Sequence, residues 1–295
     1  MRGRGAAQGE ALTVWAIWGA LAVVVAVTYS RLDPSDLYNV SRSGLAGGLS
    51  RALVLVNFPI ALVAIALVLI ALDALPRAAW WAGGPALALC AVTAWPGVVA
   101  QSDLDARLVN TLPAVGVCLA IALTVVATRR AGTSFAPRLP GDRIRAVVTA
   151  VVLVLSLPWF AADLGWYLPG GVFLTDRIVT EGQETLAAVH IGHHHGLDGA
   201  LLVISALILS RVTVRGRRLR RATTAYVALM LAYGAVNFTE DAWHEQLVKR
   251  GTIDWKIPSA KVPALSPVWL VILCLAVVAF GVLSRERGAV SQAEA

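Results

Sequence analysis

The chain has 295 residues, of which 58% are hydrophobic and only 15% are charged, and its mean hydropathy is +0.71. Its net charge of +7 does not indicate nucleic-acid binding, because the one dense basic run, RVTVRGRRLRR, is too short for a recognition module. That run suits a solvated loop beside anionic lipid headgroups. The composition is therefore that of a polytopic membrane protein.

Apolar runs recur along the whole chain, and each is long enough to cross a hydrocarbon core of about 30 Å, which takes about 20 helical residues. They lack the strict alternation of barrel strands, so helices are expected. The sequence predicts a single all-α domain, residues 1–295, with about eight transmembrane helices near 11–29, 52–72, 80–99, 109–128, 144–163, 189–210, 222–243 and 265–284.

Basic residues are distributed unevenly between the two sets of connections that eight spans would create. One set carries clearly more of them: Arg2, Arg4, Arg77, Arg129, Arg130, Arg138, Arg143, Arg145, Arg211, Arg215, Arg217, Arg218, Arg220, Arg221, Arg285 and Arg287. By the positive-inside rule both termini are then cytoplasmic. The Arg-rich, Lys-poor composition suggests a bacterial plasma membrane as the location.

Four of the five histidines lie within residues 190–195, at the head of the sixth predicted span. On a helix His190, His193 and His194 would occupy one narrow arc, and Asp198 would continue that face inward. His195 would point elsewhere. Counting from the inner boundary at about 1.5 Å per residue, His194 lies about 25 Å and His190 about 31 Å outward, near the outer surface.

The fifth histidine, His244, ends a matching polar stripe on the seventh predicted span. Asn237, Glu240 or Asp241, and His244 follow one another at i, i+3 or i+4, and i+7, and they reach a similar outer depth. Two neighbouring helices joined by a short inner loop could therefore bring histidines and a carboxylate together.

This combination of side chains is what a transition metal prefers. Imidazole nitrogens suit Zn, Fe or Cu, and three protein ligands would leave one position open for water or substrate. We expect His190, His194 and His244 as ligands, with His193 on the same arc. Glu240 or Asp241 would be the fourth ligand or the general base.

Asp198 and Asn237 would hydrogen-bond to the metal-binding imidazoles and so orient them, without binding the metal themselves. The leading interpretation is a metal-dependent enzyme acting at the extracytoplasmic face on a membrane lipid or other amphiphile. Hydrolysis is slightly favoured over oxidation.

Four alternatives remain open at the level of sequence, one of which is a proton-transfer or pH-sensing role for the histidines. The histidines could be a polar collar that pairs with carboxylates and holds two helices together. A metal transporter would need polar residues continuing inward, and beyond Asp198 only Ser205 is polar near the midplane. A non-catalytic assembly or sensor protein would use the long outer loops as its partner surface.

Known membrane families add little to this interpretation. The metalloprotease HExxH motif is absent, and membrane desaturases carry more histidines, on the cytoplasmic side. A three-histidine site among seven or eight helices loosely resembles the alkaline ceramidase and progestin-receptor group. The chain lacks that group's early Ser-x-x-x-His and late His-x-x-x-His patterns, so no residue role follows from the resemblance.

Other polar residues interrupt or end the predicted spans. Asp163 ends the fifth span and Asp33 and Asp36 follow the first, where they could cap helices or add carboxylates to the same outer cavity. Asn57 and Pro59 interrupt the second span, where a proline frees a backbone carbonyl and a kink is expected.

Overall fold

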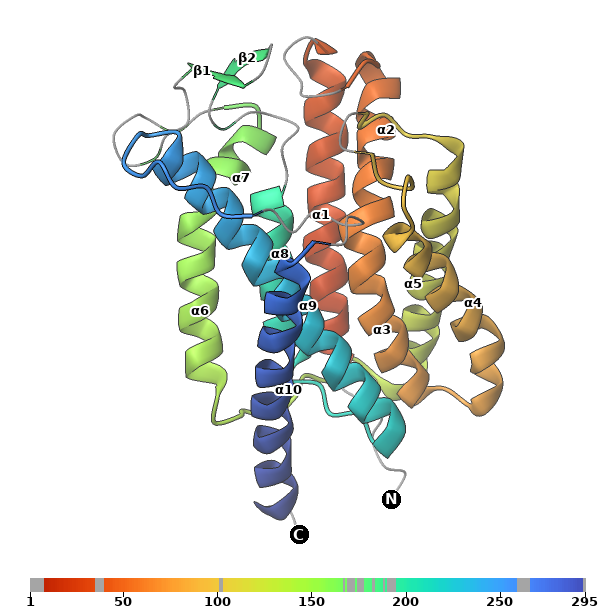
Figure 1. The fold of residues 1–295 in the computed structure, drawn as a ribbon. Coiled ribbons are helices and arrows are strands. Elements are labelled where there is room, and N and C mark those ends of the chain that lie inside the picture. Colours follow the sequence, from red (N-terminus) through yellow and green to blue (C-terminus); the bar gives the residue numbers. More distant parts are fainter. Residues whose placement is uncertain are drawn as a thin grey trace.

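A computed structural model describes residues 8–34, 40–100, 103–166, 168, 173, 178–181, 184–187, 189, 195–258 and 266–293. The described chain is a bundle of helices that run alternately up and down (Figure 1). The all-helical expectation is confirmed for this bundle. The long connection between α7 and α8 adds one short antiparallel hairpin, β1 (Ile178–Glu181) and β2 (Glu184–Ala187).

The first half of the chain forms one group of packed apolar helices. It comprises α1 (Gly9–Arg31), α2 (Gly44–Leu55), the π-helix η2 (Val56–Ile60), α3 (Ala61–Ala74), η3 (Arg77–Ala79), α4 (Trp80–Ala91), η4 (Val92–Ala94), η5 (Leu108–Asn110) and α5 (Thr111–Ala131). The elements α2, η2 and α3 form one continuous helix, Gly44–Ala74. The expected interruption at Asn57 and Pro59 is this π-helix, which shifts the helix register where proline cannot donate a hydrogen bond.

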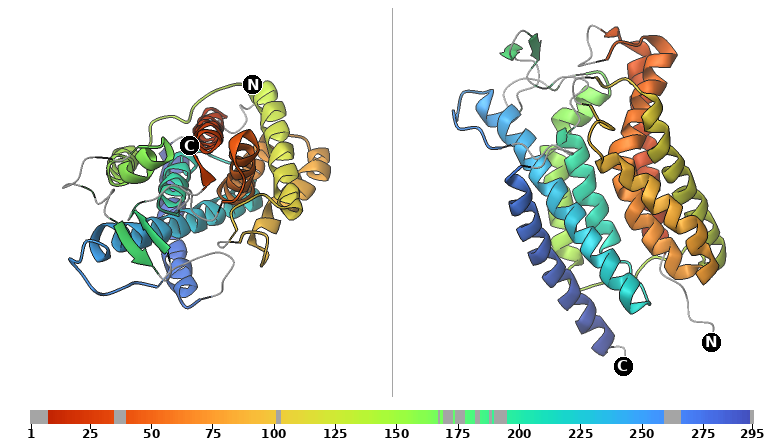
Figure 2. Two further views of the ribbon diagram at one scale, coloured as in Figure 1. Left: turned by 90° about the horizontal axis from the view of Figure 1, so that it is seen from above. Right: turned by 45° about the vertical axis from the view of Figure 1, so that its right-hand side comes forward.

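The second half packs against that group. It comprises α6 (Asp142–Leu155), α7 (Leu157–Asp163), α8 (His195–Leu209), α9 (Arg217–Trp243), the π-helix η6 (His244–Val248) and α10 (Val268–Ala293). The helices α6 and α7 meet at a bend of 55°. Figure 2 shows α9 lying alongside both α8 and α10.

Within the described residues, four helices are long and apolar enough to cross a membrane, and a fifth span results if the bent α6–α7 pair counts as one. The four are Gly9–Arg31, Gly44–Ala74, Leu108–Ala131 and Val268–Glu286. This agrees with a helical, multi-pass membrane protein. The other predicted spans coincide with α4 and α8, which are short, and with α9, which Thr, Tyr and Asn residues make less apolar.

Several predicted boundaries differ from the helices. The span expected at 80–99 ends earlier, because α4 and η4 stop before the Trp95-Pro96-Gly97 turn. Of the span expected at 189–210, His195–Leu209 form α8, whereas residues 190–194 lie outside the described residues. The helix predicted at 222–243 is instead longer than expected, because η6 continues α9 as far as Val248.

The bundle has two distinct ends. We call one the arginine end, where α1 begins, α3, α5, α8 and α10 end, and α6 and α9 begin; the other is the hairpin end, which carries β1 and β2 (Figure 1). The first described helix starts and the last one finishes at the arginine end (Figure 2). The connections predicted to be rich in arginine meet there, so the alternating path of the helices agrees with the sequence pattern.

The helices α8 and α9 meet in a close backbone contact. A Cβ atom added to Gly199 of α8 would come within 2.6 Å of the Phe238 nitrogen and 2.8 Å of the Gly234 oxygen, both backbone atoms of α9. Two glycines facing each other thus let the two backbones touch, as small residues do in membrane helix pairs. This crossing fixes α8 against α9 just below the polar residues of both helices.

Candidate functional site

Buried carboxylates gather at the hairpin end. We call the following five residues the acidic cluster, since each is at most 6% exposed: Asp163 of α7, Asp198 of α8, Glu240 and Asp241 of α9, and Glu245 of η6. A buried carboxylate is stable as an anion only with hydrogen bonds and compensating positive charge. All five lie at the end of the bundle where α7 and α9 finish and α8 begins.

His244 forms the best-defined contact of this region. Its Nδ1 lies 3.0 Å from Glu240 Oε1, one helical turn earlier. Its other ring nitrogen, Nε2, is buried and has no hydrogen-bond partner among the described residues. A neutral imidazole that donates from Nδ1 to a carboxylate carries its lone pair on Nε2. In that tautomer Nε2 is the ring nitrogen available to a further donor or to a metal ion.

Glu245 is held by the neighbouring helix α7. The indole nitrogen of Trp159 donates a 2.6 Å hydrogen bond to Glu245 Oε2, and both residues are almost completely buried. The Trp159 ring also meets the Phe238 ring edge-on, with centroids 6.0 Å apart. Gly196 lies against the same indole, where a Cβ atom would come within 2.4 Å of the ring. Trp159 thereby joins α7, α8, α9 and η6 into one framework.

A second polar group lies between α1, α2, α7 and α8. The Arg51 guanidinium sits over the Tyr29 ring, 5.8 Å from its centroid, and both side chains are buried. The Tyr29 hydroxyl is within electrostatic range of Asp163 and Asp198. Thr28 donates to the backbone oxygen of Asp163 at 2.7 Å and so ties α1 to the end of α7. A buried arginine thus accompanies the acidic cluster on this side.

The predicted site residues fall into two groups. Three of them, His190, His193 and His194, lie outside the described residues. Among the residues that the structure describes, no three His, Cys, Asp or Glu side chains come together in a geometry that could hold a metal ion. The Glu240–His244 pair is the part of the expected ligand set that the described chain brings together.

The remaining predicted residues lie near the α8–α9 crossing. Asp198 directly precedes Gly199, and Asn237 directly precedes Phe238, so both flank the contact between the two backbones. Asn237 Nδ2 donates to the Tyr233 backbone oxygen at 2.8 Å, and its Oδ1 is buried without a partner in the described part of the chain. His195 is the first residue of α8 and is partly exposed.

Sequence reasoning missed two members of this region. Glu245 was placed in a loop beyond the seventh span, but the π-helix η6 extends α9 and turns this residue inward. Arg51 was placed at the boundary of the second span, whereas α2 begins seven residues earlier, at Gly44. The signal available for Glu245 was its position beside His244 in AWHEQ, where two ionisable residues follow an aromatic one.

Comparison with known protein families, with curated proteins and with solved structures finds no match for this chain. The chemistry of the hairpin end therefore has to be argued from the residues themselves.

Proposed function

We propose that this protein is a membrane-embedded, metal-dependent enzyme whose site lies at the hairpin end. Its metal ion is Zn, Fe or Cu, held by His244 together with His190 and His194, and with His193 as a further donor. The substrate is a lipid or another amphiphile that enters from the membrane. Hydrolysis is slightly favoured over oxidation, because a metal such as zinc lowers the pKa of a bound water molecule to about 7.

The geometry of His244 is the observation that carries this proposal. Metal-binding histidines commonly donate one ring N–H to a carboxylate, which fixes the ring and makes the other nitrogen a better ligand. Glu240 provides such a carboxylate at 3.0 Å, and the opposite nitrogen is buried and unpartnered within the described residues. An imidazole that served only to join helices would be expected to use both nitrogens.

The same geometry refines the roles of the two carboxylates on α9. Because Glu240 already binds His244, we assign it to orienting the ligand rather than to proton transfer. Asp241, which is 3% exposed, is then the proposed general base. Asp198 and Asn237 would support the ligands from the α8–α9 crossing, where the buried Asn237 Oδ1 can accept an imidazole N–H.

The proposed topology has eight membrane helices with the arginine end in the cytoplasm. Support comes from the gathering of the arginine-rich connections at the end where α1 begins and α10 finishes. The hairpin end then faces the outside of a bacterial plasma membrane, and the substrate would come from the outer leaflet.

The test is the metal content of the untagged protein, purified in detergent and measured by elemental analysis. We expect about one equivalent of Zn, Fe or Cu in the parent and none in His244→Ala. His195→Ala is the matched control, since it removes an imidazole that lies outside the predicted ligand arc, and it should keep the metal. The identity of the metal would separate hydrolysis from redox chemistry.

A second variant separates metal binding from folding. Glu240→Gln keeps an oxygen that can accept the Nδ1 proton but loses the charge, so the fold should persist while metal affinity falls about 10- to 100-fold. If neither the parent nor any variant binds metal after incubation with each ion, the enzyme proposal is wrong and the cluster is a polar helix contact.

A further inference from the structure

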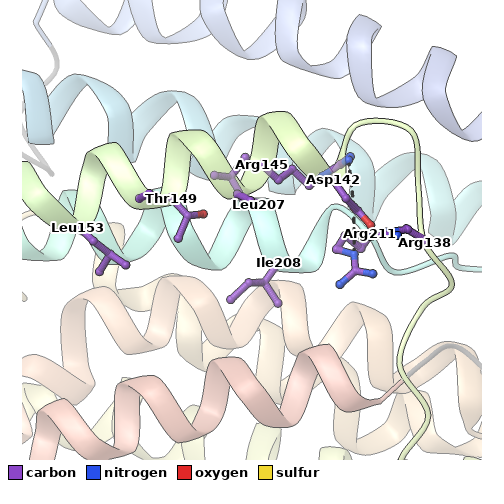
Figure 3. A pocket seen from close by; sticks show the side chains of 10 residues that line it. Arg138, Asp142, Arg145, Thr149, Leu153, Leu207, Ile208 and Arg211 are labelled. Atoms are coloured by element: carbon purple, nitrogen blue, oxygen red, sulfur yellow. Dashed lines mark ion pairs between the residues drawn. The ribbon is translucent and has the colours of Figure 1, made fainter.

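A cavity of about 620 Å³ lies at the opposite, arginine end, between α6 and α8. Figure 3 shows its two parts: Arg138, Asp142, Arg145 and Arg211 gather at one end, and the cavity then continues along α6. Neither the acidic cluster nor His244 lines it. The cavity is therefore separate from the proposed metal site.

The charged mouth offers guanidinium groups in fixed positions. Asp142 binds Arg211, with Arg211 Nε 3.2 Å from Asp142 Oδ1, and lies 3.6 Å from Arg145 Nη1. Arg145 is also paired with Glu286 of α10 and donates to Ser210 Oγ at 2.9 Å. These contacts hold two guanidinium groups rigidly at the rim.

Arg138 is different from the other two arginines. It is exposed at the mouth and forms no ion pair with any residue that the structure describes. Arg211 pairs with Glu10 as well, with Nη1 3.7 Å from Oε1, but keeps 28% of its side chain exposed. Guanidinium groups bind phosphate through paired N–H donors, and the first turn of α6 adds a positive helix end at the same place. The mouth is thus complementary to a phosphate group.

The rest of the cavity is a groove for a hydrocarbon chain. On α6 it is lined by the small residues Ala146, Thr149 and Ala150 and by Leu153, and on α8 by Leu207 and Ile208. From Asp142 to Leu153 the groove follows α6 for about 16 Å at 1.5 Å per residue. This length is about half of a 30 Å hydrocarbon core, which is the depth of one lipid leaflet.

We propose that this cavity binds an anionic phospholipid, with its phosphate at Arg138 and Arg211 and one acyl chain in the groove between α6 and α8. A peptide segment does not fit the groove, because its backbone polar groups would have no partners against these apolar walls. A free phosphate ion would use the mouth alone and leave the groove unexplained. The bound lipid fills the space between the two helices and stabilises their contact.

The test uses the full-length protein in neutral phosphatidylcholine nanodiscs, with phosphatidylglycerol added in increasing amounts. Native mass spectrometry measures the bound lipid, and thermal unfolding measures the stabilisation. We expect phosphatidylglycerol adducts and a higher unfolding temperature for the parent. Arg138→Gln should weaken binding about five-fold, the effect of removing one basic residue near an anionic lipid. Arg143→Gln is the matched control, because Arg143 lies on α6 and is exposed but does not line the cavity.

Ala150→Phe tests the groove separately from the mouth. It places a ring where the acyl chain would lie and leaves all three arginines intact, so phosphatidylglycerol binding should be lost while the protein stays folded. Equal binding of phosphatidylcholine and phosphatidylglycerol would overturn the proposal. So would stabilisation by inorganic phosphate alone at the level reached with the lipid, or an unchanged affinity in both Arg138→Gln and Ala150→Phe.

Discussion

Replacing Gly199 by alanine is expected to force α8 and α9 apart. The new Cβ atom would lie 2.6 Å from the Phe238 nitrogen and 2.8 Å from the Gly234 oxygen, whereas ordinary Cβ contacts fall at 3.4–4 Å. Both atoms belong to the backbone of a helix, so neither can rotate away as a side chain would. The clash can be relieved only by moving one helix.

The magnitude follows from two opposing effects. Overpacking a close contact costs about 1–3 kcal/mol, while replacing glycine by alanine inside a helix gains up to about 1 kcal/mol. Gly281→Ala on α10 is the matched control, because a Cβ atom there has nothing within 4 Å and brings only the gain. The free energies of unfolding of the two variants should therefore differ by about 1–3 kcal/mol, the cost of the clash alone.

The assay is equilibrium or thermal unfolding of the two purified variants in the same detergent, together with metal content. Gly199→Ala should unfold more easily than the parent, and Gly281→Ala should be as stable as the parent or more so. Since Asp198 directly precedes Gly199, the first variant should also bind metal more weakly. Equal stability of the two variants would refute the backbone contact between α8 and α9 and, with it, the placement of Asp198 beside α9.

Three further predictions concern hydrogen bonds that join distant segments, each measured as the change in unfolding free energy. Trp159→Phe keeps a smaller aromatic ring but removes the indole N–H that donates to Glu245, so it should cost about 1–3 kcal/mol, the penalty for a buried carboxylate that loses this hydrogen bond. Ser205→Ala removes the acceptor of the Trp18 indole N–H at 2.9 Å in the middle of the bundle and should cost about 1 kcal/mol, whereas Ser205→Thr should be milder. Asp73 Oδ1 accepts hydrogen bonds from two backbone N–H groups of the α8–α9 loop. Asp73→Ala should therefore destabilise the protein by about 1 kcal/mol, and Asp73→Asn by less, because asparagine keeps an oxygen at that place. Equal effects of the two substitutions would contradict this role.

Helix type and order could be predicted from the sequence because a membrane requires the same property of every span. Runs such as LVAIALVLIALDA can satisfy their backbone in lipid only as helices, and most of the predicted runs contain a helix. Helix ends were harder to predict. Trp95-Pro96-Gly97 stops a run that composition alone would continue, and a π-helix extends α9 past residues that look like a polar loop.

Within the candidate site, the sequence could predict only contacts between residues of the same helix. The i, i+4 spacing of Glu240 and His244 placed them together, as the 3.0 Å contact bears out. The bond from Trp159 to Glu245 joins residues 86 positions apart, and no periodicity in the sequence indicates it. Such pairs depend on which helices become neighbours, and this in turn depends on contacts such as the one between Gly199 and α9.

The length of α8 also limits where chemistry at the hairpin end can occur. This helix has 15 residues, so it is about 22 Å long, which is about 8 Å less than the hydrocarbon core. If its final turn lies at the membrane boundary marked by Arg211, its first turn, with Asp198, ends below the opposite surface. Asp198, which is 6% exposed, then lies within the thickness of the bilayer and is covered by the helices around it. For the enzyme proposed above, a site at this depth would be reached more easily by a molecule already dissolved in the membrane than by a soluble one, which is why we propose an amphiphilic substrate.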